Sequence, residues 1–255
     1  MCLIAFAHRV HPTYKLILVA NRDEFYKRPT RKAQFWTEEQ HPELLGGKDL
    51  EAGGMWMGLN SDGRWAALTN YRDPSIHKEN PPSRGSLVLD YLKDSPSAES
   101  YLENLPIPDQ YNGFNLLTWD WKGFYHFSNQ TGEITNIEPG IHGVSNALLN
   151  TPWPKLKRAK NALERTIKHD VIETSELLDL LVNTEKAADE DLPDTGIPYE
   201  WEKAISSMFI KTERYGTRCT SVLLIDYEGN IQFTERRYLE GTITIEDEQT
   251  YRING

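Results

Sequence analysis

Cysteine is scarce in this chain, and long runs of apolar residues are missing. Only two of the 255 residues are cysteine, Cys2 and Cys219, which excludes the disulfide framework of a small secreted domain. No stretch approaches the roughly 18 apolar residues that a membrane-spanning helix needs. The apolar start of the chain stops at Ala7, too early for the core of a secretory signal peptide. We therefore expect a soluble, cytoplasmic protein without a membrane span.

Positive charge is also in short supply. The chain has 28 Lys and Arg against 38 Asp and Glu, a formal net charge of −10, and its basic residues are scattered. A field of this sign repels a phosphate backbone, which excludes nucleic acid as a partner. A small anionic substrate stays compatible with this charge, because a few local arginines suffice to hold one.

The residues that are present predict a globular protein. Hydrophobic residues make up 38% and charged residues 26% of the chain. The length allows one large domain or two small ones, and we expect a single domain over residues 1–255. Short apolar runs predict strands, and amphipathic stretches predict helices at 84–93, 97–104, 154–169 and 174–186. The strands are expected at 2–8, 15–21, 55–59, 64–70, 114–119, 123–128, 219–226 and 230–236.

The first two runs set the expected fold class. Residues 2–8 and 15–21 are apolar throughout, which is typical of strands buried on both faces, and Pro12 marks a hairpin turn between them. Hairpins of this kind need cover on both sides. Two antiparallel sheets between layers of helices provide it, so we expect an α+β fold.

Cys2 is the first candidate for chemistry. Methionine aminopeptidases generally remove Met1 when the second residue is small, and the mature chain then begins with Cys2. A terminal cysteine carries a nucleophilic thiol and an α-amine that can act as its base. The alternative interpretation is a small hydrophobic residue in an apolar strand. The same choice applies to Cys219, for which the structural role is favoured.

A charged tetrapeptide, Asn21-Arg22-Asp23-Glu24, ends the second run. A turn near residue 12 places Cys2 opposite about residue 22 in an antiparallel pair, give or take two positions. Arg22 would then favour the thiolate of Cys2, and a carboxylate would hold or orient the α-amine. Alternatively, the strand end reaches solvent and the tetrapeptide carries ordinary surface charges.

Several further strings occur with this tetrapeptide in a characteristic order. They are Gly143-Val144-Ser145-Asn146, Thr151-Pro152-Trp153-Pro154-Lys155 and Tyr215-Gly216-Thr217-Arg218. Together with Cys2, they resemble the NRDE family, which is the family of the transport and Golgi organisation protein 2, over nearly the whole chain. More distantly, the chain is similar to choloylglycine hydrolases and penicillin V acylases. Those are N-terminal-nucleophile amidases, and the resemblance implies their four-layer αββα sandwich.

The resemblance also implies roles for particular residues. Cys2 would be the nucleophile, and Asp23 the carboxylate that holds the α-amine. Asn70, which follows the string Gly58-Leu59-Asn60-x-x-Gly63, would donate one hydrogen bond to the oxyanion, and Asn146 the other. Arg218 resembles the arginine near the nucleophile.

The chain departs from the hydrolases at one position. They have an arginine three residues before the aspartate, where this chain has Ala20. Arg22 lies two residues further along, on the same strand face, and is the candidate substitute.

These residues predict hydrolysis of an amide C–N bond in a small or lipid-like acyl amide, without a cofactor. The rival hypothesis is a binding and trafficking protein on the same fold, which holds haem, a lipid or an acyl chain beside Cys2. The spacing of His8 and His11 puts their side chains on opposite faces of a strand, so no metal site is expected.

Overall fold

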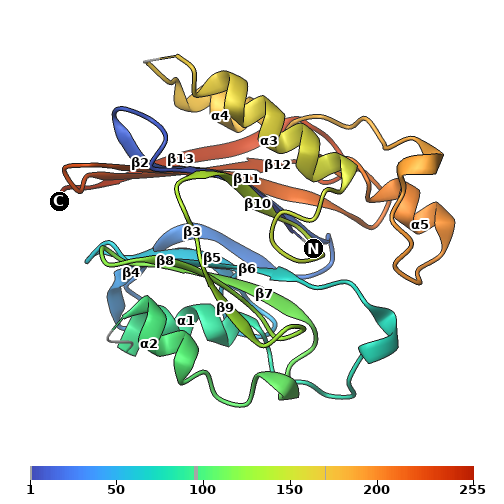
Figure 1. Ribbon diagram of the computed structural model, residues 1–255, viewed down its shortest axis with the longest axis horizontal. Helices are drawn as coiled ribbons and strands as arrows, with labels where there is room; N and C mark the ends of the chain where they lie inside the picture. Colours follow the sequence, from blue (N-terminus) through green and yellow to red (C-terminus); the bar gives the residue numbers. More distant parts are fainter. Residues whose placement is uncertain (1, 95–96, 170) are drawn as a thin grey trace. The chain divides into compact units, whose positions relative to one another are not determined.

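The computed structural model describes residues 2–94, 97–169 and 171–255. The chain forms two compact units (Figure 1). Unit 1 comprises the N-terminal residues up to Lys27 together with residues 138–145 and 149–255. Unit 2 comprises residues 28–137 and 146–148. Each unit contains one antiparallel sheet with helices, which confirms the expected α+β class. The single domain over the whole length stays a prediction.

Unit 1 is built on a six-stranded sheet with the order β10-β1-β2-β11-β12-β13. All neighbouring strands are antiparallel. Two of these strands, β1 and β2, form the predicted N-terminal hairpin. The strand bounds are Cys2–His8 for β1, Tyr14–Phe25 for β2, Gly140–Val144 for β10, Tyr215–Asp226 for β11, Ile231–Tyr238 for β12 and Ile245–Ile253 for β13.

The helices of unit 1 identify the two faces of this sheet. Helices α3 (Pro154–Thr166) and α4 (Thr174–Leu180) cover one face, where Leu3, Ala5 and Val19 share an apolar cluster with helix residues (Figure 1). Because side chains alternate along a strand, Cys2 lies on the opposite face. A third helix, α5 (Tyr199–Ala204), follows the short turn η3 (Asp189–Asp191).

Unit 2 is a seven-stranded meander in which the strands β3 to β9 pair in sequence order. Helices α1 (Gly85–Asp94) and α2 (Ala98–Glu103) contribute to an apolar cluster with one face of this sheet. Two single-turn helices, η1 (Pro74–Ile76) and η2 (Pro108–Gln110), lie in its loops. The strand bounds are Thr30–Trp36, His41–Asp49, Met57–Asn60, Trp65–Asn70, Phe114–Trp119, Phe124–Ser128 and Glu133–Asn136.

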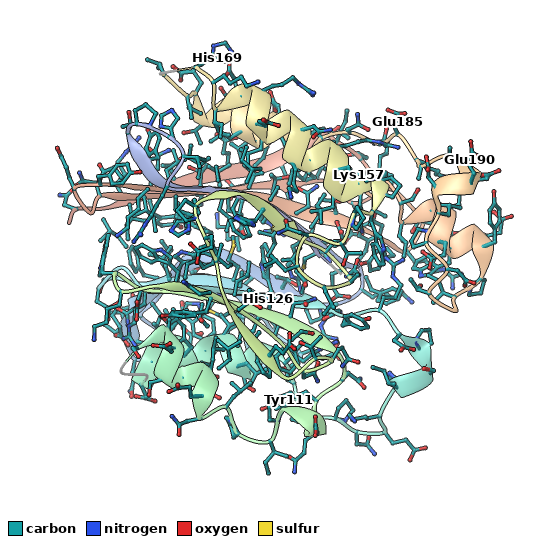
Figure 2. All side chains as sticks on the ribbon, viewed as in Figure 1. Tyr111, His126, Lys157, His169, Glu185 and Glu190 are labelled. Carbon is teal, nitrogen blue, oxygen red and sulfur yellow. The ribbon has the colours of Figure 1, made fainter. Side chains whose placement is uncertain are left out.

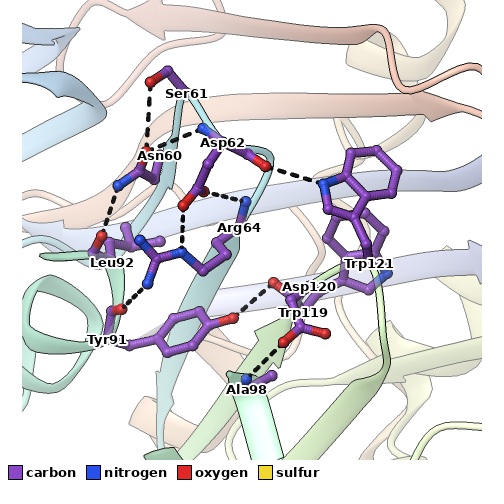
Figure 3. A network of polar contacts seen from close by, with 10 residues as sticks. All are labelled: Asn60, Ser61, Asp62, Arg64, Tyr91, Leu92, Ala98, Trp119, Asp120 and Trp121. Carbon is purple, nitrogen blue, oxygen red and sulfur yellow. Dashed lines mark hydrogen bonds and ion pairs between the residues drawn. The ribbon is translucent and has the colours of Figure 1, made fainter. Parts of the chain in front are cut away.

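A polar network ties the hairpin turns of unit 2 to the ends of its helices (Figure 3). Asn60 Nδ2 donates to Leu92 O at 2.8 Å, and Arg64 Nη1 donates to Tyr91 O at 3.2 Å. These carbonyls belong to the last turn of α1, which has no further helical donors for them. At the other helix, Asp120 Oδ2 accepts from the N–H of Ala98 at 2.8 Å, where α2 begins. Side chains thus cap one end of each helix.

Most predicted elements are present, but several strands were not predicted. The missed strands β9 and β13 consist largely of exposed or half-buried polar residues, which leave no apolar pattern to detect. The missed β3, β4 and β10 also carry a mixed pattern. Two predicted helices are shorter than expected, because α3 ends at Thr166 and α4 at Leu180. Among the described residues, no helix is long and apolar enough to cross a membrane.

Candidate active site

Cys2 is the first residue of β1, and its neighbours are fixed by strand pairing. It pairs with Arg22 of β2, which confirms the register expected from the hairpin turn. The side chain of Cys2 is buried, with 7% of its surface exposed. Met1, whose removal is expected, lies outside the described residues.

Cys2 and Arg22 belong to a row of four residues that crosses the sheet. Arg22 pairs with Cys2 on one side and with Cys219 of β11 on the other, and Cys219 pairs with Arg237 of β12. Directly paired residues lie on the same face of a sheet. One face of unit 1 therefore carries thiol, guanidinium, thiol and guanidinium side by side, opposite to the face that the helices cover.

Both thiols are held in their neutral form by burial. Burial raises the pKa of Cys2, and the Arg22 charge and the backbone N–H of Asp23 oppose this rise. Burial also raises the pKa of Cys219 well above its usual range, and the neighbouring Glu235 adds to the rise. Because a thiol attacks as its thiolate, Cys2 needs a base close by to become nucleophilic.

Asp23 lies one residue beyond Arg22, at the end of the hairpin where β1 begins. Its Oδ1 accepts a hydrogen bond of 2.7 Å from the Thr217 hydroxyl, and that hydroxyl accepts one of 2.9 Å from the N–H of Ile210. Burial raises the pKa of Asp23, while the Lys155 ammonium lowers it. Lys155 is itself buried in the first turn of α3 and donates to Ile205 O at 3.3 Å. The carboxyl group is therefore fixed at the start of β1.

The main chain of Cys2 is held as well. The Ser145 hydroxyl donates a hydrogen bond of 3.0 Å to Cys2 O, and both groups are buried. Ser145 follows directly after β10, the other neighbour of β1. The position of Cys2 is thus defined from both adjacent strands.

Arg218 lies at a bulge of β11, between Thr217 and Cys219. Its Nη1 donates to the carbonyl oxygens of Phe25 and Tyr26 at 3.1 and 3.0 Å, and its guanidinium lies over the Tyr26 ring. Burial lowers the pKa of Arg218, and the positive charge of the nearby Arg22 lowers it further. These contacts hold the segment that leaves β2, so this arginine supports the strand that carries Arg22 and Asp23.

The two predicted oxyanion donors come together in unit 2. Asn146 Nδ2 donates to Asn70 O at 3.0 Å, and Asn146 Oδ1 accepts from Arg72 Nη2 at 3.2 Å. Asn146 is fully buried, whereas Asn70, the last residue of β6, is half-buried. The structure therefore brings Asn70 and Asn146 together, and it separately brings together the predicted residues of unit 1.

A second set of bonds supports the segment after Asn146. Asn115 Nδ2 donates to Ala147 O at 2.9 Å and to Thr69 Oγ1 at 3.1 Å. His126, labelled in Figure 2, lies with its Nε2 3.0 Å from Asn115 Oδ1. Burial lowers the pKa of His126 to about 4, so its ring is neutral at neutral pH and serves as a donor to that oxygen.

Three residues of the candidate site were not assigned a role from the sequence, namely Ser145, Lys155 and Thr217. Each belongs to one of the strings on which the family resemblance rests, so the strings themselves were the available signal. Asn60 lies in such a string too, but its side chain caps α1. Among the described residues, no group of three or more His, Cys, Asp and Glu is arranged to hold a metal ion.

The fold is that of an N-terminal-nucleophile hydrolase. A variant of the conjugated bile acid hydrolase from Clostridium perfringens superposes with a TM-score of 0.55, over 100% of this chain and 92% of that chain, at 12% identity. A penicillin V acylase from Agrobacterium tumefaciens matches with a TM-score of 0.48 and 13% identity, over 100% of this chain and 86% of that chain. The first likeness confirms the fold class that the sequence resemblance implied.

The family follows from the sequence comparisons. Residues 1–240 match the family described as Transport and Golgi organisation 2. The human Transport and Golgi organization protein 2 homolog is 36% identical over 280 aligned positions, which cover 99% of both chains. The chain belongs to the Transport and Golgi organisation 2 family.

Proposed function

We propose that this chain is a cysteine N-terminal-nucleophile hydrolase that cleaves an amide bond of a small or lipid-like acyl amide. The observation that carries the proposal is the arrangement at the start of β1. There, Cys2 begins a buried strand, Arg22 is paired with it, and the buried carboxyl group of Asp23 is fixed by Thr217. A buried charge lowers stability unless it is paired, so ionisable groups that are buried together are candidates for a functional site.

The proposed reaction begins with removal of Met1, which converts the backbone nitrogen of Cys2 into the terminal amine. Asp23 lies at that end of the strand and orients the amine as a base. The amine accepts the thiol proton, and the sulfur forms a bond to the substrate carbonyl carbon. The C–N bond then breaks, and the leaving amine takes the proton. Water attacks the resulting thioester, releases the carboxylic acid and restores the thiol.

The carbonyl oxygen becomes negatively charged during both attacks. Following the family resemblance, we assign its stabilisation to the side chains of Asn70 and Asn146, as two amide donors. Among the described residues, none forms a hydrogen bond with the Asn70 side chain, so Asn70→Ala removes a donor without leaving a partner unpaired. The assignment predicts a loss of about 10²-fold in kcat for Asn70→Ala, with little change in thermal stability.

Mass spectrometry of the native, untagged protein tests the proposal first. We expect loss of Met1 and fast reaction of iodoacetamide at Cys2, mapped by peptide analysis. The protein is then incubated with a panel of N-acyl amides, and acid quenching should trap an acyl group on Cys2. The matched control is Cys219→Ala, which removes the other buried thiol and should leave both results unchanged.

Retention of Met1 together with an unreactive Cys2 would contradict the hydrolase proposal, because the base would be missing. That result would favour the binding protein on the same fold. Native mass spectrometry and the absorption spectrum of the purified protein would then show whether it carries a lipid, an acyl chain or haem.

A further inference from the structure

The Arg22 guanidinium differs from the other arginines near it. Arg22 is 5% exposed, and its Nη1 is buried with no hydrogen-bond partner among the described residues. Arg218, in contrast, donates to two carbonyl oxygens, and Arg237 Nη2 lies 3.5 Å from Glu246 Oε2. Within residues 2–94, 97–169 and 171–255, no carboxylate forms an ion pair with Arg22.

The residues beside Arg22 do not neutralise it. Its partners in the sheet are Cys2 and Cys219, and burial keeps both thiols protonated at neutral pH. Two carboxylates lie near Arg22 on the same face by register: Glu235 interacts with Cys219, and Glu24 Oε1 accepts a hydrogen bond of 2.8 Å from the N–H of Phe25. A buried guanidinium without a counter-charge is several kcal/mol less stable than in water. An anion from outside the chain would therefore supply the counter-charge that Arg22 lacks.

We propose that Arg22 binds a carboxylate of the substrate, so that the preferred substrates are amides with a carboxylate close to the scissile C–N bond. Paired residues of antiparallel strands lie about 5 Å apart, which places the guanidinium beside the Cys2 thiol. A carboxylate matches the fork of a guanidinium in shape and charge. An N-acyl amino acid, whose carboxylate is two bonds from the amide nitrogen, has this arrangement.

This inference rests on the proposed function for its substrate, but its test does not need turnover. Two alkylating reagents of nearly equal size, iodoacetate and iodoacetamide, differ in the negative charge. Their rate constants at Cys2 are measured by intact mass spectrometry in a Cys219→Ala background. We expect Arg22→Gln to lower the ratio of the iodoacetate rate to the iodoacetamide rate by about tenfold, the size of one charge-assisted hydrogen bond.

The ratio separates recognition of an anion from an effect on the thiol. Removing Arg22 also makes the Cys2 thiolate harder to form, but this slows both reagents equally and cancels in the ratio. Arg22→Lys should keep part of the preference, because it keeps the charge. The control is Arg165→Gln, an exposed position in the last turn of α3, which should leave the ratio unchanged. An unchanged ratio in Arg22→Gln would overturn the inference.

A second measurement on the chain with Arg22 intact keeps the test valid if Arg22→Gln does not fold. N-hexanoylglycine and the neutral N-hexanoylglycinamide compete with iodoacetamide for Cys2, and we expect the anion to protect at about tenfold lower concentration. Equal protection by both would contradict the inference. Hydrolysis of both amides at equal rates would leave the hydrolase proposal standing without a carboxylate site, whereas selective protection without hydrolysis would support the site and refute the hydrolase.

Discussion

Two sets of polar side chains, one in each unit, differ in how their polar groups are satisfied. In unit 2, Asn60, Arg64 and Asp120 each form hydrogen bonds with main-chain groups at helix ends and turns. In unit 1, Arg22 lacks a partner for Nη1, and burial raises the pKa values of Cys2 and Asp23. Polar groups that complete the main chain stabilise a fold, while buried groups with perturbed ionisation are candidates for chemistry. Substitutions at Asn60, Arg64 and Asp120 should therefore affect stability, whereas substitutions at Cys2, Arg22 and Asp23 should affect activity.

The largest effect is expected for Cys2→Ala. Loss of the nucleophile should lower amide hydrolysis by about 10⁴-fold or more, while removal of one small buried side chain changes the free energy of unfolding by only about 1 kcal/mol. Product release from the N-acyl amide panel and thermal unfolding measure the two quantities. Cys219→Ala serves as the matched control. Equal loss of activity in both variants would contradict the assignment of Cys2 alone as the nucleophile.

Asp23→Asn should lower kcat/KM by about 10²-fold, because the side chain still accepts the Thr217 hydrogen bond but no longer carries charge. The pH profile gives a sharper test. The pKa of Asp23 is raised by burial, so the wild-type rate should fall on acidification already at pH values above the usual carboxyl range. The variant should keep the loss of rate that protonation of the α-amine causes, and it should lack the further loss that protonation of Asp23 causes. A variant with unaltered kcat/KM would exclude Asp23 from the reaction.

Asp120→Ala should act on stability alone. Asp120 accepts from the backbone N–H groups of Ala98, Lys122 and Gly123, and the variant leaves these three donors without their acceptor. At about 1 kcal/mol each, the free energy of unfolding should fall by about 3 kcal/mol. Denaturant titration measures this loss, and the residual activity per folded molecule should equal that of the wild type.

The smallest effect concerns His126 and appears only on acidification. Its folded-state pKa of about 4 is below the value of about 6.5 for an unfolded chain, so the unfolded state binds the proton more readily. This contribution to stability is complete above pH 6.5 and is lost as the pH falls towards 4. Between pH 7 and 5, the loss amounts to about 2 kcal/mol. His126→Gln should lose less stability than the wild type over that range.

The sequence predicted the parts of the molecule that have a strong pattern. The apolar runs of β1 and β2 and the turn near Pro12 were sufficient to place Cys2 opposite Arg22, because pairing in a hairpin is local. The bonds from Thr217 to Asp23 and from Ser145 to Cys2 join residues that are 194 and 143 positions apart. No periodicity reports such contacts, and the family strings gave only their location. The unpartnered Nη1 of Arg22 is a property of the three-dimensional surroundings.

The strand order of unit 1 has a consequence for the order of events during synthesis. The neighbours of the N-terminal hairpin, β10 and β11, leave the ribosome late, while the meander of unit 2 pairs strands in the order in which they emerge. The hydrogen bond from Thr217 to Asp23 can form only after Thr217 has been synthesised. A polypeptide that ends before β11 has Cys2 and Asp23 but not the hydroxyl that fixes the carboxylate. The candidate site thus becomes complete only after most of the chain has been translated.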